Sequence, residues 1–237
     1  MVKQRLSPHD EFQLDTAETV KLIRRHRPKG IFICNPNNPT GRYFSRSEFQ
    51  EILAAAGDCL VTLDEAYLSF VDSPWSSLEM PGRSNVLVLR SMTKDYAMAG
   101  LRLGYGVAAP DIIATLRRVC PPWNVNSPAQ RAGIAALRHD HYLERCQRKL
   151  KRAKRYLESE LSALGLPPLP SEANFFLVDV GDAGAFRQSL LQKRMLVRDC
   201  SSFGLPHHIR IAPRTLSDCR RLVAAIKEIG PGKESNE

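Results

Sequence analysis

The sequence predicts an α/β fold built around a largely parallel sheet. Short apolar runs rich in β-branched residues recur along the chain, and amphipathic helix patterns lie between several of them. The composition of the 237 residues, 43% hydrophobic and 25% charged, is that of a globular protein with a full core. Strands that alternate with helices in this way are typical of βαβ units, whose strands run parallel.

Six apolar runs predict the strands of this fold. Each is five to nine residues long, as short buried strands are. The runs are GIFIC (30–34), CLVTLDEAY (59–67), NVLVLRS (85–91), RLGYGVAA (102–109), NFFLVDV (174–180) and HIRIAP (208–213).

Helix start and stop signals lie between these runs. Ser45 and Glu48 form a capping-box pattern that opens a helix over 45–56, and Gly57 is placed to end it. A Pro-Asp pair at the first turn predicts a second helix over 110–120. A third is expected over 215–230, opened by Thr215 and Asp218 and ended by Gly230.

A long helix is expected over residues 140–164. Apolar side chains recur there every three or four positions, and lysines and arginines fill the rest of the circumference. Three prolines within 167–170 end the pattern. We therefore expect 1–139 to be the remainder of a large domain, 140–164 to be a linking helix, and 165–237 to be a small C-terminal α/β domain.

The net charge of +9 raises the question of an acidic partner. Much of the excess lies on the predicted long helix, where a solvated basic face is one interpretation and nucleic-acid binding another. No aromatic residues alternate with the basic ones, so charge is the sole argument for a nucleic acid and we predict none.

Two further classes are disfavoured by the sequence pattern. No apolar stretch is long enough to span a bilayer and the N-terminus has no signal-peptide core, so we expect a cytoplasmic protein with no membrane partner. The six cysteines and six histidines lack the spacing of a zinc site, so no metal is predicted.

Polar residues follow several of the predicted strands. In an open parallel sheet, ligands bind beyond the carboxyl ends of the strands. Taken singly, each residue has a structural explanation, such as a helix cap or a solvated lysine. Together they offer an amide, a carboxylate, a phenol, hydroxyls, an amine and a guanidinium, which are the groups that pyridoxal phosphate uses. They are Asn38, Asp64, Tyr67, Ser91, Thr93, Lys94 and Arg102.

Four ordered motifs carry a family resemblance. NPNNPTG, DEAY, SMTKDYAMAGLRLGY and IRIAPRT resemble the aspartate aminotransferase superfamily of fold type I, class I/II. More narrowly, they are similar to histidinol-phosphate aminotransferases and threonine-phosphate decarboxylases. The resemblance implies a fold type I transferase with an incomplete large domain, pyridoxal phosphate as cofactor, a small-molecule substrate and a homodimer at full length.

The resemblance also implies roles for individual residues. It makes the Lys94 amine the group that forms an aldimine with the cofactor, and Asp64 the partner of the pyridine nitrogen. It assigns the remaining positions as follows: Tyr67 and Asn38 as donors to the ring oxygen, Ser91, Thr93 and Arg102 as the phosphate clamp, and Arg210 as the partner of the substrate carboxylate.

Three more residues are substrate-binding candidates with two interpretations each. Arg198 and Arg214 either are solvated surface charges or bind a phosphate or second acidic group of the substrate. Asn174 resembles a family asparagine near the substrate, but an asparagine that starts a strand explains it equally well.

The expected function is that of a pyridoxal-phosphate-dependent aminotransferase acting on an amino acid or amino phosphate. The first alternative is a lyase of the threonine-phosphate decarboxylase type, from the cobalamin pathway. The second is a truncated, catalytically inactive remnant. It arises because the N-terminal segment typical of the family, with its glycine/serine turn and stacking aromatic, is not recognised ahead of FQLD (12–15).

Overall fold

A computed structural model of the chain describes residues 1–79, 84–139 and 141–230. The chain divides into two compact units. The first unit consists of residues 1–37 and 42–143, and the second of residues 38–41 and 144–237. Residues 38–41, the last four residues of the NPNNPTG motif, therefore group with the second unit, whereas residues 35–37 of the same motif group with the first.

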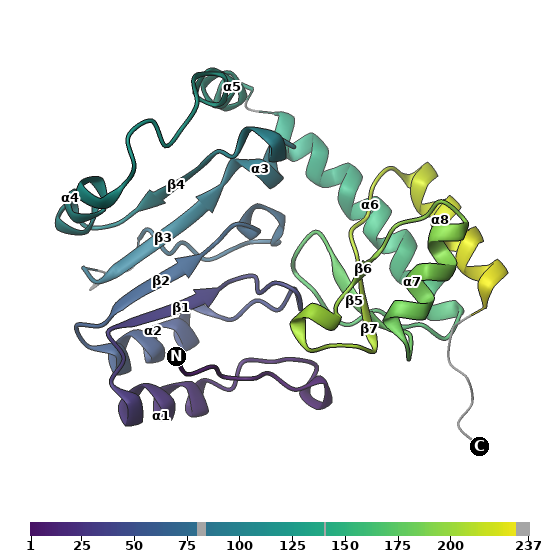
Figure 1. The fold of residues 1–237 in the computed structure, drawn as a ribbon, viewed down its shortest axis with the longest axis horizontal. Helices are drawn as coiled ribbons and strands as arrows, with labels where there is room; N and C mark the ends of the chain where they lie inside the picture. Colours follow the sequence, from purple (N-terminus) through teal and green to yellow (C-terminus); the bar gives the residue numbers. More distant parts are fainter. Residues whose placement is uncertain (80–83, 140, 231–237) are drawn as a thin grey trace. The chain divides into compact units, whose positions relative to one another are not determined.

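The first unit contains a four-stranded sheet with the strand order β1-β2-β3-β4 (Figure 1). β1, β2 and β3 are parallel, and β4 pairs antiparallel with β3, so the predicted α/β fold with a mostly parallel sheet is confirmed. In the register, Cys34 lies opposite Asp64, and Asp64 lies opposite Leu89. The strands are β1 (Gly30–Cys34), β2 (Leu60–Asp64), β3 (Val86–Ser91) and β4 (Gly104–Val107).

The helices of the first unit include three α-helices with no counterpart among the predicted ones. The predicted capping box before α2 is confirmed: Glu48 Oε2 accepts from Ser45 N at 2.7 Å and Ser45 Oγ accepts from Glu48 N at 3.3 Å. α1, α3 and α5 were not predicted. The helices are η1 (Pro8–Asp10), α1 (Thr16–His26), α2 (Arg46–Ala56), η2 (Leu68–Phe70), α3 (Met92–Asp95), η3 (Ala99–Leu101), α4 (Pro110–Val119) and α5 (Ser127–Leu137).

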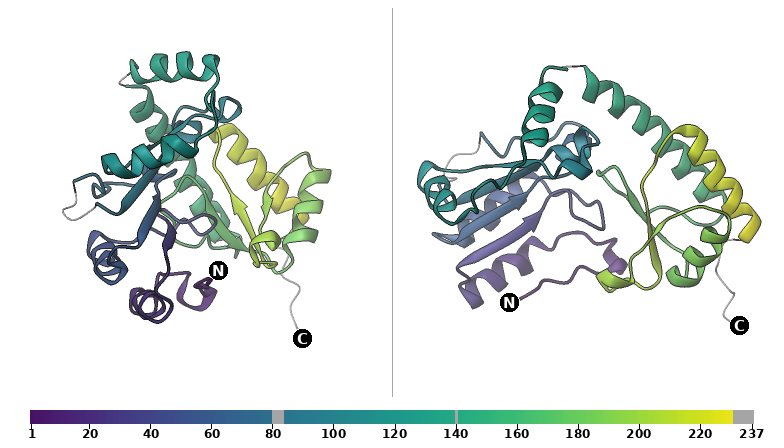
Figure 2. Two further views of the ribbon diagram at one scale, coloured as in Figure 1. Left: turned by 60° about the vertical axis from the view of Figure 1, so that its left-hand side comes forward. Right: turned by 45° about the horizontal axis from the view of Figure 1, so that its top comes forward.

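One face of this sheet is the core of the first unit. Alternate strand residues point to it and pack against α2, and α1 lies beside α2 (Figure 2). Asp64 follows the core residue Leu63, so its side chain points to the opposite face, where Phe32 is 63% exposed. The core residues are Phe44, Phe49, Val61, Leu63, Val86 and Val88.

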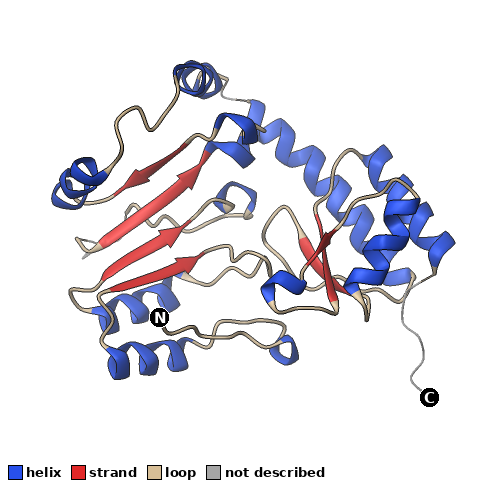
Figure 3. Cartoon of the chain, viewed as in Figure 1, coloured by secondary structure: helices blue, strands red, loops and turns tan. Residues whose placement is uncertain are grey.

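The second unit contains a three-stranded antiparallel sheet with the order β5-β7-β6, covered by helices (Figure 3). The two-residue strand β6 and the helix α7 were not predicted. The elements are α6 (Tyr142–Ala163, in this unit from Glu144 onward), β5 (Phe176–Asp179), α7 (Ala183–Gln192), β6 (Arg198–Asp199), η4 (Ser201–Phe203), β7 (His208–Ile211) and α8 (Leu216–Ile229).

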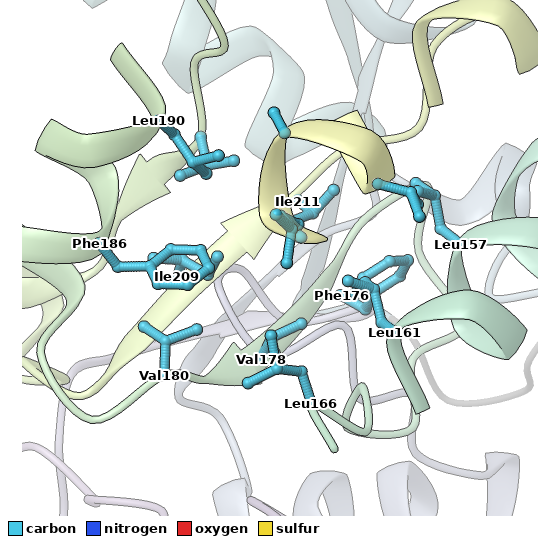
Figure 4. Close-up of a cluster of buried hydrophobic side chains, with 14 of the residues drawn as sticks. Leu157, Leu161, Leu166, Phe176, Val178, Val180, Phe186, Leu190, Ile209 and Ile211 are labelled. Atoms are coloured by element: carbon cyan, nitrogen blue, oxygen red, sulfur yellow. The ribbon is translucent and has the colours of Figure 1, made fainter. Parts of the chain in front are cut away.

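The core of the second unit lies between this sheet and its helices (Figure 4). Leu157 and Leu161 of α6 are fully buried, which confirms that the apolar stripe of the long helix faces a core. Phe176 of β5 lies beside Leu161, and Ile209 of β7 lies beside Phe186 of α7 in the same core. Across the described part of the chain, no helix combines the length and apolarity needed to cross a membrane.

Candidate active site

Six of the candidate residues lie in the first unit and form what we call the lysine cluster. They belong to the carboxyl ends of β2 and β3 and to the segments that follow those ends. Because parallel strands end at the same edge of a sheet, the topology brings these segments together. The lysine cluster consists of Asp64, Tyr67, Ser91, Thr93, Lys94 and Arg102.

Asp64 is the last residue of β2 and is held through both its backbone and its side chain. Its carbonyl accepts from Asn35 N at 2.9 Å, and its Oδ1 accepts from Ala66 N at 2.9 Å. The neighbouring Cys34 is half-buried, and burial together with the Asp64 charge raises the pKa of its thiol to about 11. Cys34 is therefore a neutral neighbour of the carboxylate at physiological pH.

Tyr67 and Lys94 meet although 27 positions separate them in the sequence. The Lys94 Nζ atom lies 5.7 Å from the centroid of the Tyr67 ring. The predicted strand over 59–67 is too long, because β2 ends at Asp64 and Tyr67 precedes the short helix η2. The chain turns at this point, so Tyr67 lies beside α3, which contains Lys94.

The hydroxyls of Ser91 and Thr93 also lie side by side. Their oxygens are 2.7 Å apart, and Ser91 Oγ accepts from Thr93 N at the start of α3. Ser91 is opposite Gly104 in the β3–β4 pairing, which places Arg102 at the same end of these strands. The Arg102 side chain is exposed and donates to the carbonyl of Ala99 at 2.9 Å.

Three charged residues beside the lysine cluster were not among the predicted site residues. Glu65 and Arg90 form an ion pair with 2.7 Å between Oε2 and Nε, and Asp95 is a half-buried carboxyl next to Lys94. A signal was present in the sequence: each is a charged residue directly adjoining a cluster residue, within or next to a buried strand or turn.

The second unit holds a separate group around Arg210 of β7. Arg210 Nη1 donates to Asn38 Oδ1, and the guanidinium carbon lies 4.8 Å from the centroid of the Phe175 ring. The structure therefore pairs Asn38 with Arg210, a contact that sequence reasoning did not anticipate. Both side chains are half-buried.

Arg198 lies opposite Arg210 in the β6–β7 pairing. Its side chain is exposed, donates to Ser202 Oγ at 3.0 Å and lies over the Phe203 ring. Like charges directly opposite one another destabilise a pair of strands unless an anion lies between or near them. We call Arg198 and Arg210 the arginine pair.

The other two substrate candidates differ in their surroundings. Asn174 precedes β5, and its Oδ1 atom is buried and accepts no hydrogen bond from any described residue. A buried acceptor in this state is uncommon and is satisfied when a ligand donates to it. Arg214 is 82% exposed at its side chain and lies 3.6 Å from Asp218 of α8, so the structure favours the interpretation as a surface charge.

The NPNNPTG segment is a turn whose first asparagine is structural. Asn35 is fully buried and exchanges two hydrogen bonds with the backbone of Phe44, at 2.9 and 3.3 Å. Gly41 has a φ of +73°, and its carbonyl accepts from Glu172 N at 2.8 Å. An added Cβ at Gly41 would overlap Ser171 Oγ and lie 2.6 Å from Ser171 Cβ.

Gly41→Ala is therefore expected to destabilise the second unit more than Gly165→Ala does. The two glycines have nearly equal φ angles, +73° and +75°, but a Cβ at Gly165 meets nothing within 4 Å. Alanine at a positive φ costs a similar backbone free energy at both positions. The clash with Ser171 should therefore add about 1–3 kcal/mol to the destabilisation by Gly41→Ala. Urea unfolding measures the difference, and equal destabilisation by the two substitutions would contradict this account of the turn.

Comparison with known proteins assigns the chain to a family. The family model described as aminotransferase class I and II matches residues 1–226. The histidinol-phosphate aminotransferase of Symbiobacterium thermophilum is 41% identical over 202 residues, which are 84% of this chain and 56% of that protein. The chain spans between 56% and 62% of the length of the curated relatives that it matches.

Solved structures agree with this assignment. The histidinol-phosphate aminotransferase from Clostridium acetobutylicum has a TM-score of 0.85 at 27% identity, over 93% of this chain and 68% of that one. The L-threonine-O-3-phosphate decarboxylase from Porphyromonas gingivalis has a TM-score of 0.76 at 30% identity, over 84% and 64%. These matches confirm the predicted fold type I architecture, and the chain belongs to the aminotransferase class I and II family.

Proposed function

We propose that this chain carries the catalytic lysine of a pyridoxal-phosphate-dependent aminotransferase of the histidinol-phosphate aminotransferase-like subgroup, acting on an amino acid or amino phosphate. The observation that carries the proposal is the placement of the Lys94 amine 5.7 Å from the Tyr67 ring centroid, in a segment that follows β3, next to the strand that ends in Asp64. The names of the related proteins support the substrate class.

The chemistry of the lysine cluster fits the cofactor used in this family. Lys94 supplies the amine that would hold the cofactor aldehyde, and Asp64 supplies the carboxylate that would face a protonated pyridine nitrogen. The Tyr67 phenol is a donor for the ring oxygen. The adjacent hydroxyls of Ser91 and Thr93, with the Arg102 guanidinium, are donors for a phosphate.

The reaction then depends on where these side chains hold and move protons. When bound, pyridoxal phosphate supplies an electron-accepting ring that stabilises negative charge at the substrate Cα. Lys94 would take the Cα proton as general base and return it as general acid. Asp64 would stabilise the positive charge of the ring nitrogen by electrostatic attraction.

The arginine pair supports a substrate with more than one anionic group. Arg210 is the candidate for a carboxylate, and Arg198, opposite it in the strand pairing, for a phosphate or a second carboxylate. The buried Oδ1 of Asn174 is an acceptor that a substrate N–H group would satisfy. An amino phosphate or an acidic amino acid matches this set.

The arginine pair also favours a second candidate, decarboxylation of an amino-acid phosphate. A substrate such as L-threonine-O-3-phosphate carries both a carboxylate and a phosphate, and a decarboxylase of this substrate is among the structural neighbours. The two candidates differ in product. Histidinol phosphate with a 2-oxo acid acceptor tests amino transfer, and release of CO2 from L-threonine-O-3-phosphate tests decarboxylation.

Arg210→Ala is expected to raise the KM for the amino substrate far more than it weakens pyridoxal phosphate binding, and Arg102→Ala is expected to do the reverse. Each guanidinium is assigned to a different anion, and loss of a charge-assisted hydrogen bond costs about 1.5–3 kcal/mol, or roughly 10- to 100-fold in affinity. Steady-state kinetics and cofactor titration separate the two effects.

Arg214→Ala is the matched control, because this exposed arginine pairs with Asp218 and should change neither constant. If Arg210→Ala and Arg102→Ala weakened cofactor binding equally, the division of roles between the two arginines would be wrong.

A further inference from the structure

The ion pair between Glu65 and Arg90 lies behind the lysine cluster. Glu65 directly follows Asp64, and Arg90 directly precedes Ser91. Side chains of neighbouring strand residues point to opposite faces of a sheet. Glu65 and Arg90 therefore meet on the core face, while Asp64 and Ser91 point to the other face from the same two strand ends.

The geometry of the pair ties these two strand ends together. Glu65 Oε2 lies 2.7 Å from Arg90 Nε, and the side chains are 1% and 25% exposed. The amide of Glu65 also donates to the carbonyl of Leu89 at 2.9 Å, so the β2–β3 ladder continues one residue past β2. Backbone and side chain together join the end of β2 to the end of β3.

The Glu65–Arg90 pair is expected to contribute little to the net free energy of folding. Burial raises the pKa of Glu65, and the charge of Arg90 opposes that shift only in part. A buried ion pair can often be replaced by apolar residues without loss of stability. Its defined geometry, in contrast, fixes the relative position of the groups that carry it.

The charge of Arg90 also acts on a carboxyl of α3. Burial raises the pKa of Asp95, while a hydrogen bond from Ser69 and the charges of Arg90 and Lys94 lower it. Asp95 is the last residue of α3 and follows Lys94 directly. The Arg90 guanidinium thus interacts with one carboxyl beyond β2 and with another at the end of the helix that contains Lys94.

We propose that Glu65 and Arg90 are positioning residues that hold Asp64 and Lys94 at a fixed separation. The proposal rests on the proposed function, since it concerns the groups assigned to the cofactor. A displacement of about 1 Å in a catalytic group costs on the order of 100-fold in rate. A rigid link behind the two strand ends prevents such a displacement without occupying the face where the cofactor would bind.

Two variants and one control test the proposal. Glu65→Gln removes the charge but keeps the shape, and the double variant Glu65→Leu/Arg90→Leu replaces the pair by apolar side chains that can keep the fold stable. Val86→Ala is the matched control, because Val86 is buried in the same core on β3 but lies at the opposite end of that strand. It loosens the core without touching the pair.

The first measurement needs no cofactor. Amide hydrogen exchange is followed in the peptides that cover residues 64–70 and 89–96. We expect Glu65→Gln and the double variant to exchange at least about tenfold faster there than Val86→Ala at matched global stability, because local opening is then no longer opposed by the pair. Equal exchange in these peptides in all three proteins would overturn the proposal.

The second measurement uses pyridoxal phosphate itself. Protein with added cofactor is reduced with borohydride, and the label on the Lys94 peptide is quantified together with the visible absorbance before reduction. We expect the dissociation constant of the cofactor to rise about tenfold or more in the pair variants and to stay near the wild-type value in Val86→Ala.

The two measurements test the proposed function and the positioning role of the pair separately. Wild-type protein that takes no label at Lys94 contradicts the proposed function, and the exchange data still decide whether the pair holds the strand ends. Wild-type protein labelled at Lys94, with pair variants that are labelled equally well and absorb alike, contradicts the positioning role and leaves the function standing.

Discussion

Lys94→Ala is expected to abolish amino transfer and to remove the covalent cofactor label. The Lys94 amine is the proposed attachment point for the cofactor and the proposed base for the Cα proton, so the substitution removes two functions at once. General acid–base catalysis alone contributes about 10²- to 10⁴-fold, and loss of turnover by at least about 10³-fold is therefore expected.

Borohydride reduction followed by peptide mass analysis locates the label. In wild-type protein the pyridoxyl mass should be found on the peptide that contains Lys94. Lys29→Ala is the control, because Lys29 is an exposed lysine of the same unit that precedes β1. A label that persists in Lys94→Ala, or that moves when Lys29 is replaced, would show that the wrong lysine has been assigned.

Asp64→Asn should leave the fold intact and lower turnover, because it raises the activation free energy by about 3–4 kcal/mol. This is the scale of a preorganised electrostatic contact in a dry site. An asparagine keeps the oxygen that accepts from Ala66 N, so the turn after β2 is preserved. It lacks the negative charge that would keep the ring nitrogen protonated.

Asp64→Ala provides the comparison, because it removes both the charge and the acceptor. If the charge matters for catalysis, the two variants should have similarly low turnover while Asp64→Ala is less stable in urea unfolding, by about 1 kcal/mol for the lost hydrogen bond. Near-normal turnover of Asp64→Asn would mean that Asp64 only caps the turn.

The elements that were predicted correctly are those specified by local signals. β1 coincides with GIFIC because its apolar residues are continuous and glycine and asparagine residues adjoin it. The capping box at Ser45 marks the start of α2, and the periodic stripe of α6 faces the core of the second unit. Each of these signals lies within a few residues of the element that it describes.

The helices that were missed had start signals that were not used. The side chains of Asp15 and Asp182 cap α1 and α7 by accepting from Glu18 N and Ala185 N. β6 has two residues and exists because β7 offers it a partner. Pairing with a distant strand, rather than intrinsic preference, creates such elements.

The sequence by itself determined the family and predicted the residues of the lysine cluster, because four ordered motifs and the polar residues at the strand ends are readable one residue at a time. Only the tertiary structure decided which residues meet: Lys94 with Tyr67, Asn38 with Arg210, and Glu65 with Arg90. It also separated Arg214, which pairs with Asp218 on the surface, from the arginine pair. These contacts join positions that are far apart in the chain, and they depend on strand register and on the face to which each side chain points, neither of which is set by local sequence.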